Sequence, residues 1–320
     1  MTPTVSTIIP TYNRRQMVLR AVRSVPADEE VVVVDDGSED WTTSALKDLH
    51  RPRLRIVGTA HRGAAAARNV GLETSRGRYV RFLDSDDWLL RGASAAQVAA
   101  IQAGADVVYG DWCDAAEGPI GTRPVLSSRS MGPLDDPVEA LLSDRWAACF
   151  CYLIRRELAA RVRWDERLAA CQDFDFALRL GIQGGRFVHV PVEVGCYFHH
   201  SGPRLSRDDL PGWCDARRRV LLGAIDLMSA RSEWSAGRRH AMAGALLHLA
   251  RVYSAQGRDG YRECIEAMSD VAPNFAPPRR AYGWLMSRLG YERTEALVGL
   301  RRRVMATLRL PKRSRSYAWV

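Results

Sequence analysis

The sequence predicts an α/β protein in which a mostly parallel sheet is flanked by helices and followed by a helical C-terminal region. Between residues 5 and 109, short β-branched runs alternate with stretches of helical periodicity, which is typical of a parallel sheet covered by helices. The run Val31–Val34 has no polar alternation, as expected of a strand buried on both faces. From about residue 208 onward, Ala, Leu and Arg recur at spacings of three and four residues, which indicates helices.

The expected elements follow in order along the chain. Strands are predicted at 5–9, 30–34, 54–57, 79–83 and 106–109, and helices at 14–25, 39–49, 64–74 and 92–103. Residues 110–137 are rich in Gly, Pro, Ser and Asp, which favours a loop or an irregular hairpin. We then expect a strand at 149–154, a helix at 173–182, a strand at 192–198, and helices interrupted by prolines at 273, 277 and 278.

Size and composition fit a globular protein with one large domain and a smaller one, since the chain has 320 residues, of which 47% are hydrophobic. No stretch is long enough to span a membrane and the first residues do not resemble a signal peptide, so the cytoplasm is the expected location. The seven cysteines lack paired CxxC spacing and the density of a disulfide scaffold, so we expect mostly buried free thiols.

The net charge is +9, and the basic residues cluster late in the chain. The clusters lie at 217–219, 238–239, 301–303 and 312–315. Their placement indicates an anionic partner for this half, either a membrane surface or an acidic substrate. Solvated helix faces would produce the same runs.

An acidic turn, Asp-Ser-Asp-Asp at 84–87, directly follows the apolar run 79–83. Three carboxylates at the C-terminal end of a strand suit a hard divalent cation, Mg²⁺ or Mn²⁺, which keeps open positions for phosphates. Short acidic turns also cap helices without binding anything. Polar residues at 10–13 and 35–38 fall at strand ends too, so three polar clusters are expected in the crevice where open α/β sheets bind ligands.

Five short motifs occur in a fixed order between residues 8 and 87. They are Ile-Ile-Pro-Thr-Tyr-Asn at 8–13, Val-Val-Asp-Asp-Gly-Ser at 33–38, Ala-Arg-Asn-Val-Gly-Leu at 67–72, Ser-Arg-Gly-Arg-Tyr at 75–79 and Phe-Leu-Asp-Ser-Asp-Asp at 82–87. Together they resemble the nucleotide-binding half of the family 2 glycosyltransferases, which are inverting enzymes with the GT-A fold, a nucleotide-diphosphate-sugar-binding fold.

The resemblance covers about residues 4–206. It implies a GT-A glycosyltransferase domain at 1–206, with a nucleotide-binding half at 1–110 and an acceptor half at 111–206 that carries the catalytic base. The basic helical region 207–320 has no motif that we can assign.

The resemblance and the chemistry of a nucleotide sugar together indicate the donor-binding residues. Tyr12 can stack on the base, and Asp36 can accept the imide N–H of uracil or thymine. Pro10 and Asn13 belong to the same motif as Tyr12. The alternative interpretations are a core-edge aromatic for Tyr12 and a helix N-cap for Asp36.

Three further residues are expected at the donor. Asp86 matches the family position that meets the ribose or the metal. Arg68 is expected mainly to brace the site, with Asp84 orienting it. Arg204 is expected either to approach the phosphates or to be solvated.

For the metal, the resemblance implies Asp87 as principal ligand, with Asp86 as a second ligand. Histidines at 199 and 200 fall in the segment where many family members place a histidine near the metal and diphosphate. By spacing from Tyr197 we expect His200, with His199 as the alternative. The cofactor is expected to be Mn²⁺ or Mg²⁺, and an imidazole ligand suits Mn²⁺ better.

The catalytic base is expected at Asp173, in the segment Gln-Asp-Phe-Asp at 172–175. Family members commonly carry Glu-Asp at the start of this helix, and Asp173 falls on the aspartate that acts as base. Gln172 stands where the glutamate is usual, which puts the acceptor-orienting role of that residue in doubt. Asp175 is expected to be structural, as an early helical carboxylate.

The resulting hypothesis is a metal-dependent inverting glycosyltransferase, similar to hexosyltransferases, that moves a sugar from a UDP- or dTDP-sugar donor to an acceptor hydroxyl by single displacement. Its basic C-terminal region would make a peripheral membrane contact, on the inner face, or form a homodimer, and no nucleic acid is expected as partner. The alternatives are a non-catalytic nucleotide-sugar-binding protein and a nucleotidyltransferase on a similar sheet. A nucleotidyltransferase would usually have a glycine-rich loop with basic residues near the N-terminus, and residues 10–15 do not supply one.

Overall fold

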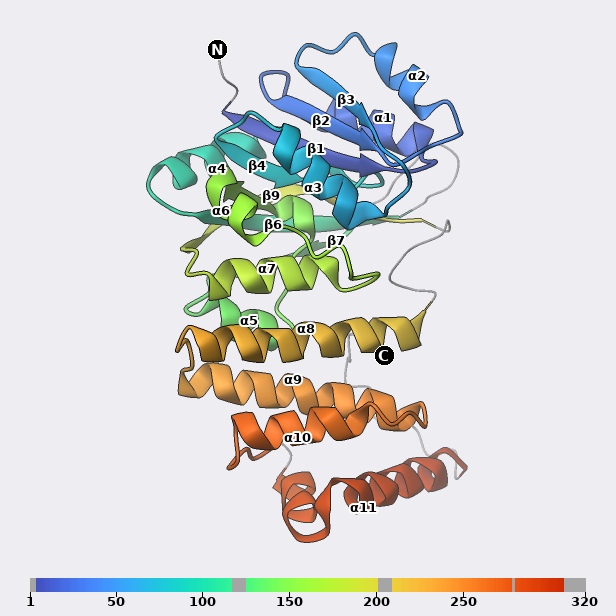
Figure 1. Cartoon of the computed structure of the whole chain (residues 1–320), viewed down its shortest axis with the longest axis vertical. Coiled ribbons are helices and arrows are strands. Elements are labelled where there is room, and N and C mark those ends of the chain that lie inside the picture. Colours follow the sequence, from blue (N-terminus) through green and yellow to red (C-terminus); the bar gives the residue numbers. More distant parts are fainter. Residues whose placement is uncertain (1–3, 117–124, 201–208, 278–279, 308–320) are drawn as a thin grey trace. The chain divides into compact units, whose positions relative to one another are not determined.

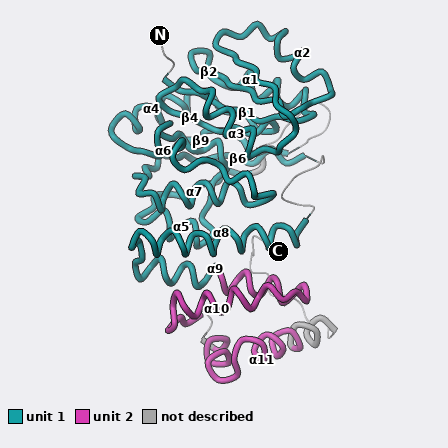
Figure 2. Tube along the Cα trace, viewed as in Figure 1, with its two compact units in different colours: residues 1–245 teal, residues 246–320 magenta. Residues whose placement is uncertain are grey.

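The chain divides into two compact units, residues 1–245 and 246–320 (Figure 2). The computed structural model describes residues 4–116, 125–200, 209–277 and 280–307. The expected boundary at residue 206, which rests on the family resemblance, stays a prediction.

Within the described part of the first unit, nine strands form one mixed sheet in the order β3-β2-β1-β4-β8-β6-β9-β5, with β7 paired to β6 (Figure 1). The pairs among β1, β2, β3 and β4 are parallel, β8 is antiparallel to β4 and β6, and β6 and β9 are parallel. The strands are β1 (Val5–Thr11), β2 (Glu30–Asp35), β3 (Leu54–Gly58), β4 (Tyr79–Phe82), β5 (Trp88–Leu89), β6 (Val107–Ala116), β7 (Val125–Arg129), β8 (Tyr152–Arg155) and β9 (Phe187–His199).

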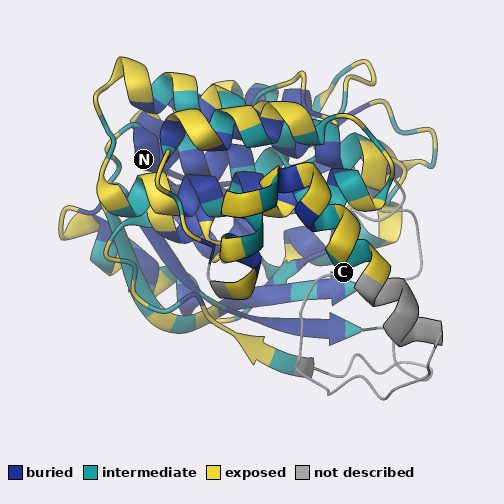
Figure 3. Ribbon diagram, turned by 90° about the horizontal axis from the view of Figure 1, so that it is seen from below, coloured by how far each residue is buried: buried dark blue, intermediate teal, exposed yellow. Residues whose placement is uncertain are grey.

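Helices pack against this sheet, and β1 and β2 are buried along their whole length. Figure 3 shows buried residues along strands and exposed residues mainly on helices and loops. In α3, Gly71 lies against β1, since a Cβ added there would come within 2.3 Å of Ile8 Cγ2. The helices of the first unit are α1 (Arg15–Ser24), α2 (Thr42–Lys47), α3 (Ala64–Thr74), α4 (Ala93–Gln102), α5 (Pro137–Leu142), α6 (Arg156–Val162), α7 (Gln172–Ile182) and α8 (Leu210–Ala230), and α9 (Ala236–Ala255) begins in it.

The strands and helices expected between residues 5 and 103 are all present, with ends shifted by a few residues. The strand expected at 106–109 is longer, because β6 continues to Ala116 in an irregular hairpin with β7. The segment expected as a strand at 149–154 begins with a 3-10 turn at Cys149–Cys151, and only then becomes β8. The strand expected at 192–198 is the second half of β9.

Two short helices and one short strand were not expected. The helix α5 carries a recognisable start signal, since the Asp136 side chain accepts hydrogen bonds from the N–H groups of Val138 and Glu139 and Pro137 begins the helix. The helix α6 and the two-residue strand β5 are short enough that periodicity gives little signal for them.

The cysteine expectation needs one correction. Cys113 and Cys196 form a disulfide, because the parallel register of β6 and β9 places them directly opposite each other. Their separation of 83 residues left no spacing signal in the sequence. The other five cysteines are free, at positions 149, 151, 171, 214 and 264, and all but Cys171 are buried.

The described part of the second unit contains the end of α9, α10 (Tyr261–Val271) and α11 (Arg280–Thr307). The helix α11 is broken at Gly290, whose φ of 75° and ψ of 172° are not helical. Glu295 ties the unit together by accepting from Arg251 Nε at 3.0 Å and from the Tyr282 hydroxyl at 2.6 Å. None of the helices in the described ranges has both the length and the apolar character needed to cross a membrane.

A buried polar network joins the beginnings of β1, β2 and β4. The Ser6 hydroxyl donates to Glu30 at 2.5 Å and accepts from the backbone N–H of Gly77 at 2.7 Å. The backbone N–H of Arg76 donates to the same Glu30 carboxylate at 2.8 Å. The chain must therefore pass very close to β1 just before β4, and this close approach requires a glycine at position 77.

We predict that Gly77→Ala lowers the free energy of unfolding by about 1–3 kcal/mol, the usual cost of overpacking. The added Cβ would lie 2.6 Å from Ser6 N and 2.8 Å from Val5 C, which are backbone atoms that cannot easily move. Urea unfolding followed by circular dichroism measures the change. Gly58→Ala is the matched control, because nothing lies within 4 Å of a Cβ there. Equal stability of the two variants would contradict the prediction.

Candidate active site

The acidic turn lies between β4 and β5, and the carboxylate oxygens of Asp84, Asp86 and Asp87 come within 4.8 Å of one another. Three adjacent carboxylates repel each other, so each needs a partner that offsets or fixes its charge. In this turn each carboxylate has a different partner, and these partners come from distant parts of the chain.

Asp84 is paired with Arg68, a buried residue of α3. The guanidinium donates to Asp84 Oδ1 at 2.7 Å and to Gln172 Oε1 at 2.7 Å, and lies 3.9 Å from Asp173 Oδ1. Burial lowers the pKa of Arg68, but Asp84 and Asp173 raise it by more, so this guanidinium stays charged. Arg68 thus joins the acidic turn to the start of α7.

The guanidinium of Arg68 also lies 4.4 Å above the ring of Trp164. The backbone at Trp164 is held by the neighbouring Asn69, which accepts from its N–H at 2.9 Å and donates to its carbonyl at 3.0 Å. On its other side, Trp164 stacks on Phe176 of α7, with ring centroids 4.3 Å apart. The Ala-Arg-Asn motif therefore fixes both the cation and the aromatic ring beneath it.

Asp86 lies between two basic side chains. Its Oδ2 accepts from Arg14 Nη1 at 2.6 Å and lies 3.0 Å from His200 Nε2. Burial raises the pKa of Asp86, but Arg14 and the hydrogen bond with His200 lower it by more, so the net pKa is below the ordinary value. Arg20 in addition donates to the backbone carbonyl of Asp86.

Asp87 is only 2% exposed, and its Oδ1 accepts the backbone N–H of Phe198 at 2.9 Å. This bond attaches the acidic turn to the end of β9. Because side chains alternate along a strand, Phe198 and His200 lie on one side of β9 and Tyr197 and His199 on the other. His200 accordingly reaches Asp86, whereas His199 Nε2 lies 3.4 Å from Asp114.

Asp173 lies in the first turn of α7, with its side chain 45% exposed and so open to a second reactant. Desolvation raises its pKa, Arg68 lowers it, and the negative charges of Asp84 and Asp86 raise it again, with the result that the pKa rises to about 6. A carboxylate with this pKa is mostly ionised at neutral pH and is a stronger base than an ordinary aspartate.

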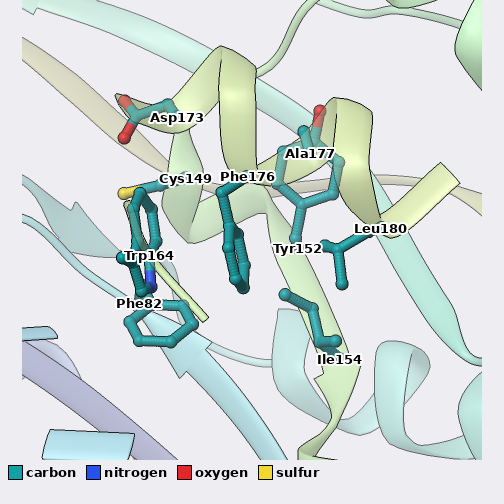
Figure 4. Close-up of a pocket in the computed structure, with 9 residues that line it drawn as sticks. All are labelled: Phe82, Cys149, Tyr152, Ile154, Trp164, Asp173, Phe176, Ala177 and Leu180. Atoms are coloured by element: carbon teal, nitrogen blue, oxygen red, sulfur yellow. The ribbon is translucent and has the colours of Figure 1, made fainter. Parts of the chain in front are cut away.

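Beneath Asp173 is a small pocket with mostly apolar walls, lined by Cys149 and by aromatic rings including Phe82 and Phe176 (Figure 4). The Cys149 sulfur lies within 4.8 Å of carboxylate oxygens of Asp84 and Asp173. Burial and those two carboxylates raise the pKa of Cys149 well above its usual range. The thiol is therefore neutral, which disfavours metal binding by this group of three, because metals bind the thiolate.

The carboxylate expected to bind the base, Asp36, is occupied by the loop after β3. Its Oδ1 accepts from Thr59 Oγ1 at 3.1 Å and from the N–H of Arg62 at 2.9 Å, and its Oδ2 accepts from the N–H of Gly63 at 2.8 Å. His61 Nδ1 lies 3.0 Å from the same Oδ2. Three acceptor positions of the carboxylate are used by hydrogen bonds from this loop, and His61 Nδ1 also lies 3.0 Å from the backbone carbonyl of Asp36. A direct contact with a base would have to use the remaining position or break one of these bonds.

The other expected donor residues surround this loop. Tyr12 stacks on His61, with ring centroids 4.0 Å apart. The Asn13 backbone N–H donates to Ser38 Oγ at 2.9 Å, and its side chain accepts from the N–H of Glu39, which joins the ends of β1 and β2. Pro10 is buried within β1. Arg204 lies outside the described residues.

Sequence reasoning missed Arg14 and Arg20 as neighbours of the acidic turn. Arg14 directly follows the first motif, so its position beside the crevice that was expected to bind a diphosphate was a usable signal. Arg20 lies over Trp88 and Phe198, at 4.3 and 4.5 Å from the ring centroids, and this stacking between distant segments left no pattern in the sequence.

Comparisons with known proteins agree with this geometry. The sequence model of glycosyl transferase family 2 matches residues 6–162. The putative teichuronic acid biosynthesis glycosyltransferase TuaG of Bacillus subtilis is 42% identical over 92 residues, which are 27% of this chain and 36% of that protein. The GalNAc(5)-diNAcBac-PP-undecaprenol beta-1,3-glucosyltransferase of Campylobacter jejuni is 33% identical over 124 residues, which are 36% of this chain and 40% of that protein. The matches thus span less than half the length of these relatives.

Solved structures resemble the chain over most of its length. S. aureus TarS 1–349 in complex with UDP-GlcNAc has a TM-score of 0.67 at 18% identity, covering 94% of this chain and 92% of that one. The mannosyltransferase PcManGT of Pyrobaculum calidifontis, in complex with GDP-Man and Mn²⁺, has a TM-score of 0.50 at 20% identity, covering 96% and 86%. At these identities the likeness shows the fold, and it confirms the predicted GT-A fold with a helical C-terminal region. Residues 6–162 therefore form a glycosyl transferase family 2 domain.

Proposed function

We propose that this protein transfers a sugar from a nucleoside diphosphate sugar to an acceptor hydroxyl, with inversion at the anomeric carbon. The observation that carries the proposal is the arrangement around Arg68. On one side of it stands Asp173, a partly exposed carboxylate with a pKa of about 6. On the other side is the acidic turn, in which Asp86 meets His200. A base and a group of oxygen and nitrogen ligands thus lie side by side, as a single displacement requires.

The donor proposed is a uridine or thymidine diphosphate sugar, which Tyr12 and His61 would bind by stacking on the base. The bonds that Asp36 makes to the loop at 59–63 support an indirect role for it, in which it fixes the loop beside the base. The complexes of TarS with UDP-GlcNAc and of PcManGT with GDP-Man agree with a nucleotide-sugar donor of this general kind.

The residues of the acidic turn fit a divalent cation. Asp86 and His200 would hold it, since they lie 3.0 Å apart and combine a carboxylate with an imidazole, a ligand pair that suits Mn²⁺ and accommodates Mg²⁺. When bound, such a cation offsets the charge that builds up on the leaving diphosphate. Asp87, which the family resemblance implies as principal ligand, is proposed instead to position His200 through its bond to the Phe198 amide.

Asp173 would take the proton of the acceptor hydroxyl while the hydroxyl oxygen attacks the anomeric carbon. The bond between that carbon and the diphosphate breaks on the opposite side, and the proton ends on the Asp173 carboxylate. Arg68 favours the ionised form of this base before the reaction. Gln172 accepts from Arg68 without adding a negative charge, so the cation is shared by two carboxylates, Asp84 and Asp173.

The expected role of the basic C-terminal region stays a prediction. Either a peripheral membrane contact or a homodimer would use the positive charge that gathers in residues 207–320. The cytoplasmic location and the chemical identity of the acceptor are likewise expectations that rest on the sequence.

We predict that Asp86→Ala and His200→Ala each weaken Mn²⁺ binding by at least about tenfold, as expected when a metal ligand is removed. Isothermal titration of Mn²⁺ into protein saturated with UDP measures this without requiring turnover. Asp87→Asn is the control, because its amide oxygen can still accept the Phe198 N–H. Loss of Mn²⁺ binding in Asp87→Asn but not in Asp86→Ala would contradict the assignment and identify Asp87 as the ligand.

We predict that Asp173→Asn lowers turnover by about 10²- to 10⁴-fold, the usual contribution of a general base, while UDP and Mn²⁺ bind as in the wild type. In the wild type, kcat/KM should fall about tenfold per pH unit below about pH 6, because protonated Asp173 cannot accept a proton. The assay is release of UDP from UDP-glucose and UDP-GlcNAc, and of dTDP from dTDP-glucose. A variant as active as the wild type would rule out Asp173 as the base, and an acid limb near pH 4 would contradict the raised pKa of Asp173.

A further inference from the structure

A group of aromatic side chains lies on the side of β9 that faces away from His200. From Trp112 to Ala116, β6 pairs with β9 in continuous parallel register, with Asp114 opposite Tyr197. Paired residues point to the same face of a sheet and alternate residues share a face. Trp112 and Asp114 of β6 therefore share a face with Tyr197 and His199 of β9.

Trp146, from the loop after α5, covers this face. Its ring centroid lies 6.0 Å from that of Trp112, at an interplanar angle of 33°, and 6.5 Å from that of Tyr197, at 76°. Trp112 is 7% exposed, whereas Trp146 remains 37% exposed. A large indole that is held by two aromatic neighbours and still open to solvent provides a rigid binding surface at little entropic cost.

Polar groups with fixed positions adjoin the aromatic rings. The Asp114 carboxylate accepts from Arg129 Nε at 2.8 Å and from Ser127 Oγ at 3.3 Å, and lies 3.4 Å from His199 Nε2. The side chain of Arg129 is itself half-exposed. An aromatic surface edged by a carboxylate, a guanidinium and an imidazole matches a pyranose ring, which has an apolar face of C–H groups and a rim of hydroxyls.

The chain connection of this surface favours the acceptor over the nucleotide, because Trp146 lies close in sequence to Cys149, which lines the same pocket as Asp173. The sheet order places β6 three strands from β1, which carries Tyr12 at its end, and three strand spacings amount to about 14 Å. Trp146 is only three residues from Cys149, a span of at most about 11 Å. The Cys149 sulfur in turn lies within 4.8 Å of an oxygen of Asp173.

We propose that Trp146, supported by Trp112 and Tyr197, is the stacking platform for a pyranose ring of the acceptor. The proposal rests on the glycosyltransferase function proposed above and adds to it the chemical class of the acceptor, a glycan. A ring that stacks on Trp146 would hold the acceptor hydroxyl near Asp173, and Asp114 and Arg129 would bind its other hydroxyls.

The test compares Trp146→Ala and Trp146→Phe with Trp41→Ala. Trp41, at the start of α2, is a matched control because it is 76% exposed and belongs to the same unit. A panel of methyl glycosides and disaccharides, including cellobiose, maltose and chitobiose, is titrated into each protein in the presence of UDP and Mn²⁺. Binding is followed by saturation-transfer NMR and calorimetry, and transfer to any binder is then assayed for the acceptor KM.

We expect at least one saccharide to bind the wild type, and Trp146→Ala to weaken its binding and raise the acceptor KM by about tenfold or more. Trp146→Phe should lose less saccharide affinity, because it keeps an aromatic face. Trp41→Ala should change the saccharide affinity and the acceptor KM by less than about twofold. UDP should bind all four proteins equally in the presence of Mn²⁺.

Three results would overturn the proposal. The first is that no saccharide in the panel binds a wild type that does bind UDP and Mn²⁺. The second is that Trp146→Ala binds the saccharide as the wild type does. The third is that Trp146→Ala weakens the binding of a UDP-sugar relative to that of UDP and leaves saccharide binding unchanged. This result would place the sugar of the donor on the platform. Failure of the glycosyltransferase function itself would be seen separately, as a wild type that binds neither UDP nor Mn²⁺.

Discussion

The buried guanidinium of Arg68 is the interaction on which the arrangement of the site depends. A charge enclosed by protein is stable only when it is paired and hydrogen-bonded, so α3, the acidic turn and the start of α7 must meet at this point. Arg68 bonds Asp84 and Gln172 and lies near Asp173, segments separated by as many as 105 positions in the chain. Without this cation, Asp84 and Asp173 would stand close together as two unpaired negative charges. The same charge that assembles the site thus keeps its proposed base ionised.

The three carboxylates of the acidic turn are chemically identical but differ in their surroundings, and that difference separates their roles. Asp84 is held by Arg68, Asp86 lies between Arg14 and His200, and Asp87 accepts a backbone N–H from β9. The contact of Asp87 determines which residue Asp86 meets. Because Asp87 fixes the turn at Phe198, the residue two positions further along lies on the same side of the strand and reaches Asp86. Asp87 can therefore affect metal binding by positioning His200, without being a metal ligand itself.

The sequence predicted the strands between residues 5 and 83 well, because Val31–Val34 and the neighbouring strand residues are buried on both faces and form continuous apolar runs. The sequence predicted less about the contacts and roles of individual side chains. The partners of Asp86 and Asp87 come from residues 14, 198 and 200, and the loop at 59–63 occupies Asp36. Such contacts depend on how distant segments pack, which periodicity does not encode. The disulfide between Cys113 and Cys196 was missed for the same reason, since it follows from strand register and not from spacing.

The register of β6 and β9 links the proposed metal site to the proposed acceptor site. One side of β9 carries His200 toward Asp86, and the other carries Tyr197 and His199 toward Asp114 and the Trp146 platform. A slip of one residue would exchange these two sides, and would turn His200 away from Asp86 and Tyr197 away from Trp146. Two contacts oppose such a slip: the disulfide, which joins directly paired positions, and the bond from Phe198 to Asp87. Both contacts lie within a few residues of His200. They therefore fix the register at the part of β9 that contributes to both the proposed metal site and the proposed acceptor site. The placement of the proposed acceptor site relative to the proposed metal site would therefore be set by the backbone pairing of two strands.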